Sequence, residues 1–140
     1  SVDYERNDYV QIVEATGNMS YEKILTESSL MVTDYSGVQF DFAYMRKPIL
    51  YYHPDTLPPH YEAGGLIYET MGFGPICQNH EEIVENLCEY MKNQCKMKEM
   101  YVKRADDFFA YDDFENCHRI YEAVENYMDE TKRGKMNGYC

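Results

Sequence analysis

A short polar turn between two apolar segments holds the residues best suited to chemistry. It consists of Thr33, Asp34, Tyr35, Ser36 and Gly37. A helix is expected to begin near Gly37. At a helix N-terminus the first backbone N–H groups have no partner inside the helix, and the helix dipole favours negative charge. The Ser36 hydroxyl and these N–H groups are therefore suited to holding a phosphate group.

The same turn also has a purely structural explanation, which the residues alone favour. Asp34 or Ser36 can cap the following helix, and Gly37 can ease the bend of the chain. Because a carboxylate repels phosphate, in the binding hypothesis Asp34 braces the turn or accepts from a ligand hydroxyl. Asp41, one helical turn further on, is either a solvated helix position or a second acceptor for sugar or ligand hydroxyls.

The segment over residues 53–73 is long for a simple connection, and such loops usually have a function. Its polar candidates are His53, Asp55, His60, Tyr61 and Glu62. Their spacing is neither helical nor of the CxxC type, so we expect no metal site and no resident cofactor. His60 and Tyr61 could bring a cation and a hydroxyl to a diphosphate; the alternative is an ordinary surface loop.

Strand-like and helix-like segments alternate along the chain and must position these residues. The sequence predicts strands over residues 9–14, 30–32, 48–52 and 74–77, and helices over residues 20–27, from 37 to Pro48, from 79, over 96–109 and over 115–129. This alternation is typical of a mostly parallel α/β sheet, whose ligands bind beyond the carboxyl ends of the strands. We expect residues 33–37, residues 53–61 and the turn after Cys77 to converge there.

Apolar residues at helical spacing mark the helix faces expected to be buried. They are Val38, Phe42 and Met45; Ile83, Leu87 and Met91; and Cys117, Ile120, Tyr121, Val124 and Met128. Two helix starts carry capping signals, namely Ser20 as an N-cap and the run from Asn79 to Glu82 as a capping box.

Composition restricts the possible partners and the compartment. The 140 residues carry a formal net charge of −12, which disfavours nucleic acid and anionic lipid. No apolar run approaches membrane-spanning length. The five cysteines form no CxxC pair, and we interpret them as reduced, mostly buried thiols of a cytoplasmic protein.

Length predicts one domain. We assign residues 1–130 to it and expect the polar residues 131–140 to form a disordered tail. The sequence opens with Ser1 instead of Met, and four short strands are few for a parallel sheet, so we expect a fragment of a larger protein.

Three motifs follow one another closely in the middle of the chain. Residues 32–38 contain Thr-Asp-Tyr-Ser, residues 40–43 read Phe-Asp-Phe-Ala, and residues 47–52 begin with Lys-Pro-Ile. Together they resemble the CDP-glycerol glycerophosphotransferase family, whose members polymerise teichoic-acid-type polymers. The resemblance spans about residues 9 to 125 and includes His60-Tyr61-Glu62.

This resemblance implies a two-lobed GT-B enzyme, of which the chain is most of the C-terminal, donor-binding lobe with a Rossmann-like sheet. It implies transfer of glycerol phosphate from CDP-glycerol, or from a related CDP-alditol, to a polymer hydroxyl with release of CMP. The expected substrate-binding residues are Thr33, Asp34, Tyr35, Ser36, Gly37, Asp41 and Tyr61, and the expected catalytic residue is His60.

The resemblance also implies that the acceptor polymer and a general base belong to an N-terminal lobe absent from this chain, which alone should be inactive. We expect the full-length protein to be cytoplasmic and peripheral to the inner face of the membrane, with any membrane association made by its other parts. Gly37 departs from the family's commoner second serine, which removes one hydroxyl but leaves a backbone N–H and allows a closer ligand approach. His53-Pro54 is not the family's His-Pro pair, which precedes Ser1.

Two other functions stay open. The turn also resembles the donor loop of sugar-nucleotide GT-B glycosyltransferases and UDP-GlcNAc 2-epimerases, which use a uridine donor. The chain could also be a non-catalytic α/β interaction module, in which Ser36 and His60 are only capping and surface residues.

Overall fold

The computed structural model describes residues 9–13, 20–56 and 65–136. Its helices and strands are α1 (Tyr21–Glu27), β1 (Met31–Thr33), α2 (Gln39–Tyr44), β2 (Ile49–Tyr52), α3 (Tyr68–Met71), β3 (Ile76–Cys77), α4 (His80–Lys92), α5 (Glu99–Phe108) and α6 (Asn116–Met136). The elements predicted from residue 20 onward are present, with ends that shift by up to about four residues, except that α6 continues to Met136 instead of ending at residue 129. The short helix α3 is an addition, in a segment whose sequence has no clear period.

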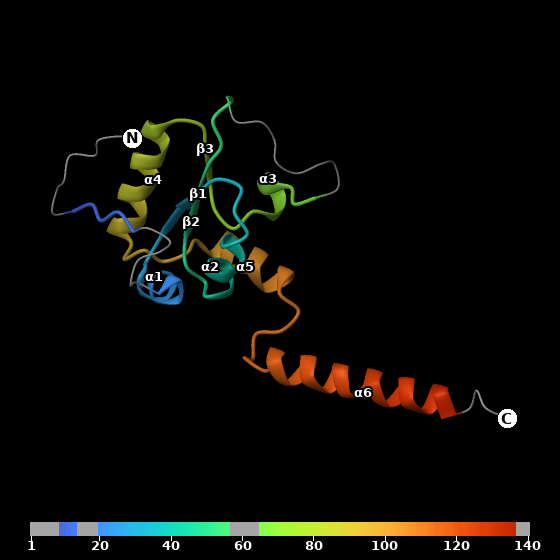
Figure 1. The fold of residues 1–140 in the computed structure, drawn as a ribbon. Helices are drawn as coiled ribbons and strands as arrows, with labels where there is room; N and C mark the ends of the chain where they lie inside the picture. The colour runs from blue at the N-terminus through green and yellow to red at the C-terminus, as the bar shows by residue number, and fades with distance from the viewer. Residues whose placement is uncertain (1–8, 14–19, 57–64, 137–140) are drawn as a thin grey trace.

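The strands of the described chain form one parallel sheet in the order β1-β2-β3 (Figure 1). Thr33 pairs with Tyr51, and Tyr52 pairs with Cys77. Parallel strands have their carboxyl ends at the same edge of the sheet, so the turn after β1 and the chain leaving β2 meet there. The predicted parallel α/β class is confirmed.

Successive residues of β2 point to opposite faces of the sheet, and the first three are buried, so both faces are covered. Ile49 and Tyr51 belong to the main core cluster, together with Phe42 of α2 and Tyr101 of α5. Leu50 is equally buried and faces the other side, where α4 contacts β2 and β3. Figure 1 shows α2 and α4 on opposite sides of the sheet, as expected for a partial Rossmann-like lobe.

The predicted capping box at the start of α4 is confirmed. Asn79 Oδ1 accepts from the backbone N–H of Glu82 at 2.9 Å. The Glu82 carboxylate accepts from the backbone N–H of Gln78, the residue before the N-cap, at 2.8 Å. The prediction for the buried face was wrong at its last position, since Tyr90 is buried and Met91 is exposed. They lie three and four residues after Leu87, so periodicity could not choose between them.

The long helix α6 extends away from the rest of the molecule (Figure 1). Its apolar stripe, predicted to be buried, is exposed along its length: Cys117, Ile120, Tyr121, Val124 and Met128. A helix face is buried only where a second surface lies beside it, and the described elements provide none for this stripe. Residues 131–136, predicted to belong to a disordered tail, are helical; residues 137–140 lie outside the described chain.

One arginine ties the end of α2 to the segment from which α6 starts. Arg46, which follows the C-cap residue Met45 of α2, adopts a positive φ of 57°. Its guanidinium pairs with Asp106 of α5 at 2.8 Å and with Asp112, in the connection to α6, at 3.0 Å. Ion pairs therefore hold both α5 and the middle of the connection to α6 against the end of α2.

Three smaller expectations were wrong. Residues 9–13 form neither strand nor helix, because β-rich composition makes a strand only where a neighbouring strand can pair with it; residue 14 lies outside the described chain. Ser20 is the N-cap residue of α1, as predicted, and only the capping hydrogen bond expected of its side chain is not made. Among the cysteines Cys77 is buried, and burial raises its pKa, whereas Cys88 and Cys117 are exposed.

Candidate functional site

The turn after β1 lies against the residue that follows β2. His53 Nε2 is 3.4 Å from the carbonyl oxygen of Asp34, and the His53 backbone N–H donates to the carbonyl oxygen of Cys77 at 2.9 Å. The predicted convergence is thus confirmed for the turn at residues 33–37 and His53, and Cys77, the residue before the third predicted turn, contacts His53. His60 and Tyr61 lie outside the described residues.

An aromatic cluster forms the wall of this edge. The rings of Tyr35 and His53 are stacked, with centroids 4.1 Å apart and planes 21° apart. Tyr68 of α3 meets both rings edge-on, at centroid distances of 5.6 Å and 4.7 Å. His53 was among the polar candidates of the segment over residues 53–73, whereas the sequence assigned Tyr68 no role in the site.

The turn ends in two backbone N–H groups that precede α2. Within the described chain, the N–H groups of Ser36 and Gly37 donate no hydrogen bond. Ser36 Oγ accepts from the N–H of Val38 at 3.4 Å, which is long for such a bond, and Val38 is the N-cap residue of α2. The serine therefore caps the helix weakly, as the structural explanation predicts, and leaves the two preceding amides available. The helix starts at Gln39, later than predicted.

Gly37 is not required by packing. A Cβ atom added there would meet no other atom within 4 Å, and the residue has no positive φ. The space beside the turn is therefore open, and it would accommodate a small side chain at this position.

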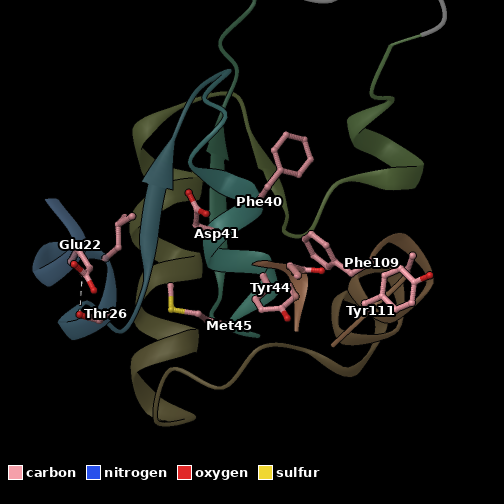
Figure 2. A pocket seen from close by; sticks show the side chains of 11 residues that line it. Glu22, Thr26, Phe40, Asp41, Tyr44, Met45, Phe109 and Tyr111 are labelled. Carbon is pink, nitrogen blue, oxygen red and sulfur yellow. Dashed lines mark hydrogen bonds between the residues drawn. The ribbon is translucent and has the colours of Figure 1, made fainter. Parts of the chain in front are cut away.

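A separate groove lies along the flank of α2, and Figure 2 shows its lining. It measures about 530 Å³, and its mainly apolar walls come from α1, α2 and the segment after α5, with Leu25, Met45 and Phe109 among them. Asp41 lines this groove, whose lining includes no residue of the turn at 33–37. The structure thus places Asp41 in a groove whose lining does not include Ser36 or Gly37.

Residues 9–13, 20–56 and 65–136 contain no group of three His, Cys, Asp or Glu side chains that could hold a metal ion. They also include no helix with both the length and the apolar character needed to cross a bilayer.

Comparison with known proteins identifies the family. The model of the CDP-Glycerol:Poly(glycerophosphate) glycerophosphotransferase family matches residues 1–126, which include the turn, His53 and the whole sheet. The chain belongs to this family. Glycerophosphotransferases are transferases, so the family and fold expected from the motifs are both confirmed.

Among the relatives of this glycerophosphotransferase-family chain is the minor teichoic acid biosynthesis protein GgaB of Bacillus subtilis (strain 168). It is 42% identical over 134 residues, which cover 96% of this chain and 14% of GgaB. The teichoic acid glycerol-phosphate primase of the same strain is 27% identical over 86% of this chain and 30% of its own length. The teichoic acid poly(glycerol phosphate) polymerase of Bacillus spizizenii (strain ATCC 23059 / NRRL B-14472 / W23) is 38% identical over 41% of this chain and 15% of its own length.

The chain therefore spans less than a third of each of these relatives. No solved structure gave a significant match.

Proposed function

We propose that this chain is the donor-binding part of a glycerophosphotransferase of teichoic-acid-like polymer synthesis. In this proposal the enzyme transfers glycerol phosphate from CDP-glycerol, or from a related CDP-alditol, to a hydroxyl of a growing polymer. The observation that carries the proposal is the family match across residues 1–126, which contain two open amides at the carboxyl edge of the sheet.

The chemistry needs positioning more than covalent help from the protein. The acceptor oxygen attacks the phosphorus that bears glycerol, its bond to that phosphorus forms, and the bond to the bridging oxygen of CMP breaks. A general base on another part of the longer polypeptide takes the acceptor proton. The Ser36 and Gly37 amides and the Ser36 hydroxyl are suited to stabilising the charge that grows on the departing CMP phosphate.

The remaining residues have supporting roles in the proposal. Thr33, Asp34 and Tyr35 shape the turn, and His60 and Tyr61 contact the donor from the loop that follows β2. The role of Asp41 as an acceptor for ligand hydroxyls stays a prediction, because Asp41 lines the flank groove.

The partners and the compartment follow from the proposed reaction. The polymer acceptor binds mainly to other parts of the longer polypeptide. The reaction takes place in the cytoplasm at the inner face of the membrane, and parts outside this chain make the membrane contact. An acidic domain with a net charge of −12 is not itself expected to bind anionic lipid.

The first test measures which nucleotide the chain prefers. CDP, CDP-glycerol, CDP-ribitol and UDP-GlcNAc are titrated into the 140-residue chain by isothermal calorimetry. The proposal expects the cytidine nucleotides to bind at least tenfold more tightly than UDP-GlcNAc. A preference for the uridine nucleotide would instead favour a sugar-nucleotide enzyme.

The second test asks whether the turn takes part in turnover. Ser36→Ala and His60→Ala in the full-length enzyme should each lower polymer formation by at least tenfold. Ser20→Ala is the matched control, because Ser20 also precedes a helix but makes no capping hydrogen bond. Unchanged turnover in both site variants would favour a non-catalytic interaction module.

A further inference from the structure

A buried chain of hydrogen bonds lies directly behind the turn. Gln39, the first residue of α2, is 0% exposed. Its Nε2 donates to the Tyr68 hydroxyl at 3.0 Å, and its Oε1 accepts from the Tyr51 hydroxyl at 2.7 Å. The Tyr51 hydroxyl oxygen in turn accepts from the backbone N–H of Phe73 at 3.2 Å. Both ends of the carboxamide are therefore paired.

Burying the Gln39 carboxamide in the core has a free-energy cost that an apolar side chain would not have. Removing an amide from water costs several kcal/mol unless its hydrogen bonds are replaced, whereas Met or Leu would fill a similar volume without that cost. This chain also tolerates unpaired hydroxyls elsewhere, since in the described residues the buried hydroxyls of Tyr44 and Tyr90 have no hydrogen-bond partner. The complete pairing around Gln39 therefore indicates a role in fixing geometry, which satisfied buried networks do well.

The network connects to the turn through one ring. Tyr68, held by Gln39, packs edge-on against Tyr51 at 4.7 Å, against His53 at 4.7 Å and against Tyr35 at 5.6 Å. Tyr35 and His53 are the stacked pair, and His53 Nε2 faces the Asp34 carbonyl oxygen. A change in the direction of Tyr68 must therefore displace the rings that border the open amides.

We propose that Gln39 is a positioning residue of the donor site. By holding the hydroxyls of Tyr51 and Tyr68, it keeps the Tyr35–His53 pair in place and so sets the direction of the Ser36 and Gly37 N–H groups. This inference depends on the proposed function, because it concerns the same site. N–H groups that are already oriented bind a negative charge without the cost of reorientation. Loss of the network should therefore weaken binding of the CDP-alditol substrate.

Two variants remove the network while keeping the core filled. Gln39→Met has a similar length but cannot pair with either hydroxyl, and Tyr68→Phe keeps the ring while losing its hydroxyl. Tyr90→Phe is the matched control for a lost hydroxyl, because that hydroxyl is buried without a partner. Leu50→Val is the control for general destabilisation, because it removes a methylene from the opposite face of the sheet.

The readouts are the amide signals of Ser36 and Gly37 and the ring-proton signals of His53 in NMR spectra of the ligand-free chain, followed by CDP affinity from calorimetry. Gln39→Met and Tyr68→Phe should both shift these signals and weaken CDP binding about tenfold. Both controls should leave the signals and the affinity unchanged.

A purely structural role for Gln39 predicts a different pattern. If the two variants fold but leave the turn signals in place, or shift them without changing CDP affinity, the positioning role is wrong. If Gln39→Met fails to fold, Tyr68→Phe decides the question alone. If the wild-type chain binds neither CDP nor CDP-glycerol, the proposed function fails, and the ligand-free spectra still decide whether Gln39 sets the turn.

Discussion

The helices α2 and α6 carry the same sequence signal and have opposite surroundings. Each has apolar residues at helical spacing. In α2, Phe42 is 1% exposed, whereas in α6 Ile120 is 64% exposed and Val124 is 52% exposed. In the sequence α2 connects β1 to β2, and because these strands pair, the apolar side chains of β2 pack against the helix. In contrast, α6 follows an exposed connection, and no described element packs against its apolar face. Periodicity therefore identifies the face of a helix that can be buried but does not identify its partner.

The largest expected effect comes from truncating equivalent positions of the two stripes. Phe42→Ala should lower the free energy of unfolding by about 3–5 kcal/mol, because it leaves a cavity in the core. Val124→Ala should change it by less than about 0.5 kcal/mol, because the side chain is already in water. Urea unfolding followed by circular dichroism measures both values. A loss of more than about 1.5 kcal/mol in Val124→Ala would mean that the α6 stripe is packed in solution.

Two glycines sharpen the same contrast between packed and open sites. A Cβ at Gly74 would collide with the backbone carbonyl oxygen of Ile49, and backbone cannot move aside as a flexible side chain can. Gly74→Ala should therefore destabilise the fold by about 3 kcal/mol. Gly37→Ala, beside open space, should change stability by less than about 0.5 kcal/mol. Thermal unfolding compares the two, and similar losses would contradict the open geometry of the turn.

The smallest effect concerns the start of α6. The two carboxylate oxygens of Asp113 accept from the Arg119 guanidinium at 2.7 Å and 2.9 Å, and this pairing lowers the pKa of Asp113 to about 2. The contribution of the pair to helix stability is complete above the unfolded-state pKa of 3.8 and is lost as the pH falls through about 2. An NMR titration of the Asp113 carboxyl carbon measures this pKa.

Arg119→Gln should return the Asp113 pKa towards its ordinary value and remove the acid dependence of the helix signal at the start of α6. An unchanged Asp113 pKa in this variant would show that other donors, such as the Glu115 backbone N–H, hold the carboxylate.

Much of the fold was predictable because its signals are local. The unit from β1 to β2 was found from two apolar runs, the stripe around Phe42 and the stop at Pro48, and these features act within one stretch of chain. The capping box at Asn79 was found for the same reason. The fate of α6 was not predictable, because it depends on which surfaces lie beside the helix and not on the helix itself.

The site was predictable only in part. The turn and its convergence with the end of β2 followed from the rule that parallel strands share a carboxyl edge. Gln39 was missed because a polar residue is ordinarily assigned to the solvent side of a helix, although Gln39 lies three positions before Phe42 and shares its face. Tyr68 was missed because α3 lies in a segment without periodicity, and its role depends on a contact with Gln39, 29 positions away.

The arginine after α2 has a consequence for solution conditions. The partners of Arg46, Asp106 and Asp112, are about half exposed. Solvent therefore surrounds both ion pairs, and dissolved salt weakens the attraction of each aspartate for Arg46. The screening distance falls from about 8 Å at physiological ionic strength to about 3 Å at 1 M salt. Concentrated salt should therefore widen the range of directions in which the C-terminal helix points, while the sheet, held by backbone hydrogen bonds and an apolar core, keeps its shape.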